Sequence, residues 1–473
     1  MSSSLNTLPL PLENLEEIAG CVVTPDEPDY DRTRAVFYGD IDKRPAAILR
    51  VATDDDVRCA VEAAQMGGYE LAVRSGGHSV AGHSSTEGGL VIDLRNMSRI
   101  DIDHVCNTAW VETGATARQV TEALSKHDLI IGFGDAGSVG VGGITLSGGI
   151  GFLVRKYGMT IDSVLAAEVV TADGRYRRVD AEHDPDLFWA IRGGGGNFGV
   201  VTRIKFRLNP LSHFTGGLLV LPATPETIAG FVAMALAAPN ELSTIANVMP
   251  APPLPFLPSA ELGRPVILAS MAFAGADAAA LRAIAPFRSL ATPLADLVKA
   301  GPYLAMFPPE DPTVRPIGVS RTMFMDAVDI DAANTILDYL SASNAPMRAA
   351  QIRALGGAMA RVPADATAFA HRSRSVLVNV AAFYQDRTTR DRHRAWVAAF
   401  SKALQPDDDA AYVGFLTADD ATRVRAAYPG STWERLARIK AIYDPANLFH
   451  LNYNVPPTAP SVRDSEMPRL RLA

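Results

Sequence analysis

The sequence predicts an α+β protein in which a middle region is inserted into a glycine-rich domain. From about residue 44 to residue 208, glycine is dense, and short β-rich runs alternate with helical ones. Glycine then thins and proline-rich connectors appear, until the chain returns to a helix and a loop near its end. We therefore expect residues 1–211 and 420–473 to form one domain and residues 212–419 to form another.

The glycine-rich part predicts alternating strands and helices. Strands are expected where apolar and β-branched residues run between turns, and helices where apolar residues recur about every four positions. The expected strands are AAILRVAT (46–53), LAVRS (71–75), GGLVIDL (88–94), TAWVETGA (108–115) and VVTRIKFRL (200–208), with a hairpin in VLAAEVVTADGRYRRV (164–179). The expected helices are DDDVRCAVEAAQMGG (54–68), TARQVTEALSKHD (116–128) and DPDLFWAIR (184–192).

The middle part predicts an antiparallel sheet that helices cover on one side. Strand candidates such as SRTMFMDAV (320–328) and SVLVNVAAFY (375–384) alternate with helices such as DAANTILDYLSAS (331–343). The tail is expected to form a helix over TWERLARIKAIYD (432–444), and the stretch from Val455 onward looks like a loose end.

The composition is that of an ordinary soluble protein. Of 473 residues, 48% are hydrophobic and 20% are charged, and 44 Lys and Arg stand against 52 Asp and Glu, a formal charge of −8. An acidic chain without a basic run argues against a nucleic-acid partner and against an anionic membrane surface. The first residues do not read as a signal peptide, and no apolar run reaches membrane-spanning length, so we expect a cytoplasmic protein.

The three cysteines, Cys21, Cys59 and Cys106, are scattered and odd in number. This pattern is unlike a disulfide framework or a cysteine metal site, and it suits a reducing compartment. We expect the cysteines to have buried packing roles.

Three glycine loops could hold the phosphates of a ligand. The loop GGGGNFG (193–199) contains a formal GxGxxG pattern. A helix is expected before it and a strand after it, which is the reverse of what a Rossmann dinucleotide site requires. A nicotinamide site is therefore disfavoured, and the alternative is a helix-to-strand turn with room for a ligand beside the backbone.

The second loop, GDAGSVGVGGITLSGGIGFL (134–153), spreads its glycines over a dozen residues. They are Gly140, Gly142, Gly143, Gly148, Gly149 and Gly151. Successive backbone N–H groups in such a loop bind anionic oxygens without a cationic side chain. The alternative is a series of structural tight turns, although such turns more often include Asn and Asp.

The third loop is RSGGHSVAGH (74–83), in which His78 follows a glycine pair. An imidazole there could contact whatever the glycine backbone approaches closely. The alternatives are a surface turn histidine and a metal pair with His83, for which no carboxylate or cysteine cluster supplies further ligands. Loops with almost no Lys or Arg favour a dinucleotide held mainly by backbone amides, and the missing Rossmann context favours FAD in a different fold.

Four segments of the chain carry a resemblance to a known family. They are RSGGHSVAGHSSTEGGLVIDLRNM, SVGVGGITLSGGIGFLVRKYGM, DLFWAIRGGGGNFGVVT and YDPANLFHLNYNVPP. In order and spacing they resemble the berberine-bridge-enzyme-like FAD-linked oxidases of the vanillyl-alcohol-oxidase (PCMH-type) superfamily. The resemblance covers nearly the whole chain and implies a two-part PCMH-type FAD-binding domain with an inserted substrate domain.

In this family the histidine of the GGH turn is bonded to the 8-methyl group of the flavin, and the resemblance places that role on His78. Many members add a second bond from a cysteine, and Ala136 stands at that position here. The resemblance therefore implies FAD linked through His78 alone, as in the subgroup that resembles 6-hydroxy-D-nicotine oxidase. Such a link should raise the flavin's potential and favour hydride acceptance.

The resemblance also implies which residues contact FAD. Beside His78 they are Arg74, Ser75, Gly76, Gly77, Ser79 and His83 in one loop, Val139, Gly140, Gly142, Gly143, Ile144, Gly148, Gly149 and Gly151 in another, and Asp162, Val200, Val201, Asn452 and Asn454 farther along the chain. The family commonly has glutamine between those two asparagines. Tyr453 replaces it here, and this change either shapes the pocket or only affects packing.

The family's catalytic base does not carry over. The strand that supplies it in plant members reads SVLVNVAAFY here, which offers Asn379 and Tyr384 but no Glu, Asp or Lys, and Gly414 replaces an asparagine of the family. Either the substrate loses hydride with little help from a base, or Asn379, Tyr384, Tyr453 or His371 assists. For each of the two tyrosines and His371, a packed aromatic or a hydrogen-bonded histidine is the alternative.

We therefore expect an oxidase that removes a hydride from an amine or alcohol carbon and passes the electrons to molecular oxygen. Its substrate should be a small, largely apolar molecule of the secondary-metabolite kind. The alternatives are a dehydrogenase of the same fold with another electron acceptor and a flavin-carrying protein without turnover. No metal is expected.

Overall fold

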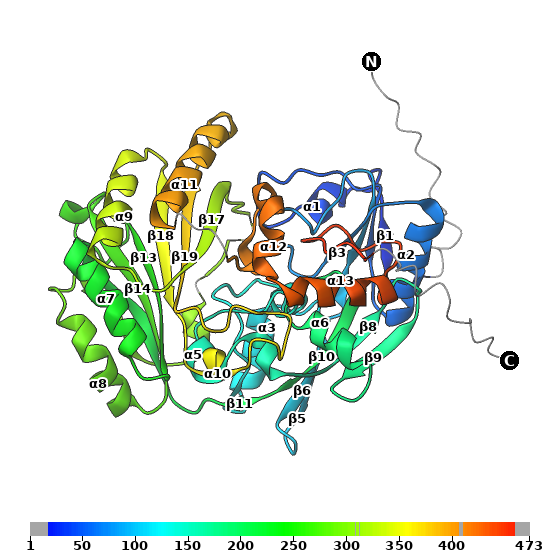
Figure 1. Ribbon diagram of the computed structural model, residues 1–473, viewed down its shortest axis with the longest axis horizontal. Helices are drawn as coiled ribbons and strands as arrows, with labels where there is room; N and C mark the ends of the chain where they lie inside the picture. Colours follow the sequence, from blue (N-terminus) through cyan, green and yellow to red (C-terminus); the bar gives the residue numbers. More distant parts are fainter. Residues whose placement is uncertain (1–17, 308, 312, 406–409, 459–473) are drawn as a thin grey trace.

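The computed structural model describes residues 18–307, 309–311, 313–405 and 410–458 (Figure 1). An eight-stranded sheet with its helices forms the left lobe of Figure 1, and a four-stranded, a five-stranded and a two-stranded sheet belong to the right lobe. The chain builds the right lobe first and enters the left lobe at strand β12 (Phe214–Pro222). It is back in the core of the right lobe by residues 411–416 and continues there into helix α13 (Ser431–Tyr443). This order confirms the predicted fold class, and the domain boundaries after residues 211 and 419 stay predictions.

The first sheet of the right lobe has the strand order β1-β2-β4-β3, with β2, β4 and β3 parallel. The elements are β1 (Cys21–Val23), α1 (Tyr30–Arg34), β2 (Ala47–Arg50), α2 (Asp54–Gly67), β3 (Leu71–Arg74) and β4 (Leu90–Asp93). Parallel strands are covered on both faces, which explains the apolar runs in β2 and β4. Helix α2 begins where Thr53 Oγ1 accepts the N–H of Asp56, and it ends at Gly68 with a φ of +64°.

The second sheet is antiparallel, with the order β5-β6-β10-β8-β9. Its strands are β5 (Ile100–Asp103), β6 (Thr108–Glu112), β8 (Val164–Val170), β9 (Tyr176–Asp180) and β10 (Val200–Arg207), and β7 (Leu129–Ile130) pairs with β11 (Asn209–Pro210). The helices of this region are α3 (Ala117–Ser125), α4 (Val141–Leu146), α5 (Val154–Tyr157) and α6 (Pro185–Ile191). Helix α4 lies inside the second glycine loop, where two glycines among six residues give little sign of a helix in the sequence.

The left lobe is one antiparallel sheet whose outer face is covered by helices, as predicted (Figure 1). Its strands are β12, β13 (Leu242–Pro250), β14 (Pro265–Ala274), β15 (Ala295–Asp296), β16 (Lys299–Ala300), β17 (Gly318–Met325), β18 (Met347–Ala354) and β19 (Val376–Phe383). The covering helices are α7 (Pro225–Ala237), α8 (Asp277–Arg288), α9 (Ile330–Ala342) and α11 (Arg390–Leu404). On the inner face, Phe324 and Leu377 pack against Ile150 and Tyr412, which joins the lobes.

The tail completes the right lobe. The short helix α12 (Val424–Ala427) directly precedes α13, whereas the short helix α10 (Ala358–Arg361) lies earlier in the chain, between β18 and β19. After α13 the chain runs back over both sheets, because Phe449 packs in the core of the first sheet and Val455 in the core of the second. The predicted loose end continues past residue 458, outside the described residues.

The cysteines differ from the expectation. Cys21 and Cys106 are exposed, Cys59 is half-buried, and all three are free thiols. Cys21 lies on the edge strand β1 and Cys106 in the turn between β5 and β6, so neither points into a core. The prediction of buried packing is therefore wrong for these two residues.

Within the part of the chain that the structure describes, no helix combines the length and the apolar character that crossing a bilayer requires.

Candidate active site

A cavity of about 380 Å³ opens in the right lobe beside the glycine loops. Its lining comes from segments that are far apart in the sequence, within 37–38, 71–84, 94, 134–150, 195–201, 412–415 and 449–453. This size is typical of a site for a small molecule or cofactor. All three predicted glycine loops therefore share one cavity.

The loops 74–83 and 134–153 touch one another at the cavity. A Cβ on Gly140 would overlap Ser75 Oγ and the amide nitrogen of Gly76. Ser75 Oγ also donates a hydrogen bond of 2.5 Å to the carbonyl oxygen of Thr113, just after β6. Glycine is required at this crossing because only a residue without Cβ lets the two backbones meet.

Other glycines of the loops face open space instead. A Cβ on Gly143, or on Gly196 of the loop 193–199, would meet no protein atom within 4 Å, and both residues line the cavity. The backbone at both positions is therefore bare beside the cavity. Backbone that is bare toward a cavity is suited to the phosphates of a dinucleotide, because its N–H groups can approach the oxygens closely.

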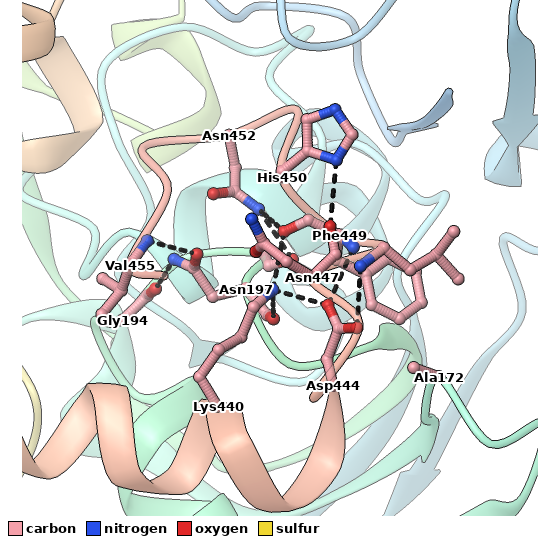
Figure 2. Close-up of polar contacts among 12 residues, drawn as sticks. Ala172, Gly194, Asn197, Lys440, Asp444, Asn447, Phe449, His450, Asn452 and Val455 are labelled. Atoms are coloured by element: carbon pink, nitrogen blue, oxygen red, sulfur yellow. Dashed lines mark hydrogen bonds and ion pairs between the residues drawn. The ribbon is translucent and has the colours of Figure 1, made fainter. Parts of the chain in front are cut away.

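Figure 2 shows how the loop 193–199 is tied to the C-terminal segment. Lys440 of α13 is fully buried, and its Nζ donates to the carbonyl oxygens of Asn197 (2.6 Å) and Phe449 (2.9 Å). It also pairs with the Asp444 carboxylate at 2.6 Å. Asn197 Oδ1 accepts the N–H of Val455 at 2.9 Å. These contacts hold the C-terminal segment against the glycine loop.

The same network places Asn452 at the cavity. Its Nδ2 donates to the carbonyl oxygens of Phe449 (2.8 Å) and Gly196 (3.1 Å), whereas its Oδ1 is buried and has no partner among the described residues. A buried amide oxygen without a partner is costly unless a ligand satisfies it. Asn452 is therefore a candidate to bind a polar edge of a cofactor.

His78 lies in the cavity wall between Phe37 and Ser138. Its ring stacks on Phe37 with 4.1 Å between the centroids, and its Nε2 lies 2.8 Å from Ser138 Oγ. Its Nδ1 makes no hydrogen bond with the described residues. Burial lowers the pKa of His78 to about 4, and the charges of Glu310 and Asp135 only partly oppose this. The imidazole is thus neutral at pH 7 and has a ring nitrogen available as a nucleophile.

His83 lies nearby and is also neutral. Its ring meets that of Tyr453 edge-on at 4.8 Å, and its backbone N–H donates to Ser79 Oγ. Burial lowers the pKa of His83 to about 4. Over the described ranges, no group of three His, Cys, Asp or Glu side chains is arranged to hold a metal ion, so nothing supports the alternative of a metal pair.

Most predicted cofactor residues line this cavity, but seven of them do not. The seven are Arg74, Gly148, Gly149, Gly151, Asp162, Val200 and Asn454. Arg74 is buried and donates to the carbonyl oxygens of Thr33 and Ser84, and both carboxylate oxygens of Asp162 bind Arg372 at 2.8 Å. These two residues support the loops, and their contact with a cofactor stays a prediction.

Of the four predicted catalytic residues, Tyr453 lies in the cavity lining and the others lie outside it. The Tyr453 hydroxyl donates to the carbonyl oxygen of Leu416, and burial raises its pKa, so it stays protonated. Tyr384 belongs to the core on the helix side of the large sheet and stacks on the His393 ring at 4.9 Å. His371 Nε2 lies 2.8 Å from the carbonyl oxygen of Ala426.

Asn379 is the fourth candidate, on strand β19. It lies opposite Gln351 of β18 and Thr322 of β17, and its Oδ1 has no partner among the described residues. The roles of all four candidates stay predictions.

Asp135 is a lining residue that the sequence analysis did not identify. Its Oδ2 accepts a hydrogen bond of 2.6 Å from Arg353 of β18, which is 218 positions away in the chain. The available signal was an acidic residue inside a glycine loop, but an Asp at such a position is typical of a turn. Arg353 gives no local signal because only the packing of the two lobes brings it to the site.

Comparison with known proteins agrees with this site. The family model for an FAD binding domain matches residues 45–180, and the model for berberine and berberine-like proteins matches residues 411–456. The chain is 29% identical to (R)-6-hydroxynicotine oxidase of Paenarthrobacter nicotinovorans, over 97% of this chain and 99% of that protein. It is 28% identical to the FAD-linked oxidoreductase YgaK of Bacillus subtilis (strain 168), over 93% of this chain and 98% of that one.

Solved structures of related oxidases have a similar fold. The fold matches 6-hydroxy-D-nicotine oxidase from Arthrobacter nicotinovorans with a TM-score of 0.83 at 25% identity, over 93% of this chain and 98% of that one. A variant of berberine bridge enzyme matches with a TM-score of 0.82 at 22% identity, over 95% and 99% of the two chains, which concerns the fold alone. The two family models cover the glycine loops 74–83 and 134–153 and the segment that closes the cavity, whereas the loop 193–199 lies between them. The chain therefore carries an FAD binding domain match and a berberine-like match, and it is similar over nearly its whole length to FAD-linked oxidoreductases of the berberine-bridge-enzyme-like kind.

Proposed function

We propose that this protein is an FAD-dependent oxidase of small organic molecules. It binds FAD in the glycine-lined cavity and oxidises its substrate at an amine or alcohol carbon. The flavin supplies the acceptor for the hydride, and molecular oxygen is the final electron acceptor. The observation that carries the proposal is the combination of bare glycine backbone with a neutral, buried His78 in one cavity.

The residues of the cavity fit FAD. Gly143 and Gly196 leave space that a Cβ would fill, and Asn452 offers an amide oxygen without a partner. The lining also contains apolar side chains, among them Leu71, Val73 and Phe449, which belong to one hydrophobic cluster. We assign the glycine backbone to the phosphates and Asn452 to a polar edge of the flavin.

We further propose that His78 holds the flavin through the only covalent bond. In this proposal Nε2 carries the ring proton and donates to Ser138 Oγ, which fixes the imidazole and leaves the lone pair of Nδ1 as the nucleophile. Ala136 lines the cavity at the position where family members have a second attachment residue, and it has no group that could form a bond. A neutral imidazole is required for the attachment, and the low pKa of His78 meets that requirement.

The substrate class follows from two kinds of support. A relative over nearly the full length is an oxidase of 6-hydroxynicotine, an amine. The walls near Asp135 carry the apolar side chains of Ile150, Tyr412 and Phe415, which suit a small, largely apolar molecule. We assign residues 212–419 to a substrate domain, since residues 412–415 line the cavity and Arg353 binds the lining residue Asp135 from that part.

Denaturation of the purified protein tests the proposal. The wild type should keep one flavin per chain by intact mass after denaturation, and His78→Ala should release it. His83→Ala is the matched control, because it removes another buried neutral histidine of the same cavity and should retain the attached flavin. Release of flavin from the denatured wild type would rule out the covalent link, and a protein purified without flavin would contradict the assignment as an FAD enzyme. Production of hydrogen peroxide with an oxidisable amine separates an oxidase from a dehydrogenase.

A further inference from the structure

Asp135 carries the single carboxylate among the described residues that line the cavity, and none of those residues is Lys or Arg. Its side chain is 31% exposed, whereas that of its partner Arg353 is 5% exposed. Oδ2 is taken by Arg353, and Oδ1 accepts no hydrogen bond from the described residues. The carboxylate of Asp135 therefore faces the cavity, and the guanidinium of Arg353 lies in the wall behind it.

Arg353 is held firmly in that wall. Its Nη1 donates to the carbonyl oxygen of Ile150 at 3.1 Å. Its Nε and Nη2 donate to Gln351 Oε1 at 3.1 and 2.7 Å, and its guanidinium lies 5.1 Å from the centroid of the Phe415 ring. With its donors shared in this way, Arg353 orients Asp135 without moving into the cavity.

The negative end of the pair acts on the neighbouring lining groups. The charge of Asp135 raises the pKa of His78 and of Tyr38, in each case as a smaller contribution beside burial. At Tyr412, which also lines the cavity, burial raises the pKa, and the charge of Arg353 lowers it by more than the opposing charge of Asp135 raises it. Both histidines of the lining are neutral at pH 7, so Oδ1 of Asp135 is the anionic oxygen of the lining that accepts no hydrogen bond from the described residues.

We propose that Asp135 recognises the cationic nitrogen of the substrate and so restricts this enzyme to amines. The ammonium group donates to Oδ1 of Asp135 while Arg353 keeps Oδ2. The rings of Tyr412 and Phe415 border the same space and favour a cation beside their faces. The inference rests on the proposed oxidase function and narrows its substrate class from amines or alcohols to amines.

Binding of three matched probes to the holoenzyme, measured by calorimetry, tests this inference. The probes are benzylammonium, benzyl alcohol and benzoate, which share a ring and differ in charge. The wild type should bind benzylammonium roughly tenfold or more tightly than benzyl alcohol, as expected for a charge-assisted hydrogen bond. Benzoate should bind most weakly.

Three variants then test whether the Asp135 carboxylate itself causes the preference for the cation. Asp135→Asn should lose the preference for the cation and gain affinity for benzoate, because Arg353 is left unpaired. The double variant Asp135→Asn/Arg353→Gln removes both charges and should bind the ammonium and the alcohol equally well. Glu310→Gln is the matched control, since this carboxylate also acts on His78 but accepts from the N–H groups of Gly137 and Ser138 outside the lining. It should keep the wild-type preference.

The outcomes distinguish this inference from the proposed function. If the wild type carries flavin but binds benzyl alcohol as tightly as benzylammonium, the assignment of Asp135 is wrong while the oxidase proposal stands. The same conclusion follows if Asp135→Asn keeps the preference. If the purified protein carries no flavin, the proposed function itself fails. Because the wild-type comparison needs no variant, a variant that does not fold leaves the test intact.

Discussion

Two ion pairs in this molecule, Lys440–Asp444 and Arg353–Asp135, have opposite surroundings. Lys440 and Asp444 are both fully buried, and backbone groups complete their hydrogen bonds, as Figure 2 shows. Asp135 and Arg353 form a pair that is closed on the arginine side and open on the carboxylate side. From this difference we infer that a buried charge has a structural role when each of its polar atoms has a hydrogen-bond partner. A buried charge becomes a candidate for chemistry when one atom faces a cavity without a partner.

The closed pair should give the largest effect on stability. Lys440→Met leaves the Asp444 carboxylate buried without its cation, and we expect the free energy of unfolding to fall by about 3–5 kcal/mol. Urea titration followed by tryptophan fluorescence measures this loss. An unchanged midpoint would mean that the network of Figure 2 does not hold the C-terminal segment.

Loss of the cation from the Asp135–Arg353 pair should lower the free energy of unfolding by less. Arg353→Met leaves Asp135 facing a cavity that water can enter, so we expect a loss of about 1–2 kcal/mol. The same urea titration applies, with Asp135→Asn/Arg353→Met completing a double-mutant cycle. A loss as large as that of Lys440→Met would remove the distinction between the two pairs.

Gly143 tests whether the cavity, rather than the fold, requires its glycine. Gly143→Ala adds a Cβ that meets no protein atom in helix α4, so the flavin-free chain should gain about 0.5–1 kcal/mol of stability. Flavin content per chain, read from the absorption spectrum, should nevertheless fall. Gly301→Ala is the control, because its Cβ also meets nothing but lies outside the lining, and flavin content there should not change.

The smallest expected effect on stability near neutral pH comes from the titration of His83. Its pKa in the folded chain is about 4, below the ordinary value of 6.5, so the unfolded chain binds the proton first as the pH falls. Stability should therefore be lost between about pH 6.5 and pH 4. His83→Gln should show a shallower loss than the wild type when thermal midpoints are compared over this window. An identical slope in both proteins would mean that His83 titrates normally.

The sequence predicts the cofactor side of the site better than the substrate side. Loops 74–83, 134–153 and 193–199 are contiguous stretches, and their repeated glycines indicate backbone that can approach another segment or a ligand closely. Arg353 and Asp135 come together only through packing of the two lobes, which no local pattern encodes. The seven predicted residues outside the lining show a second limit, since Gly149 and Gly151 make room for the Thr160 side chain and the carbonyl oxygen of Phe133 rather than for a ligand.

The contact between Asn197 and Val455 has a consequence for the order of assembly. It spans 258 positions, and the whole left lobe lies between its two ends. Closing so long a loop costs entropy that the contacts repay only after the intervening lobe is compact. A nascent chain that still lacks residues 444–455 therefore has its glycine loops but not the segment that closes the cavity. Stable capture of the cofactor should be an event of the finished polypeptide, after synthesis rather than during it.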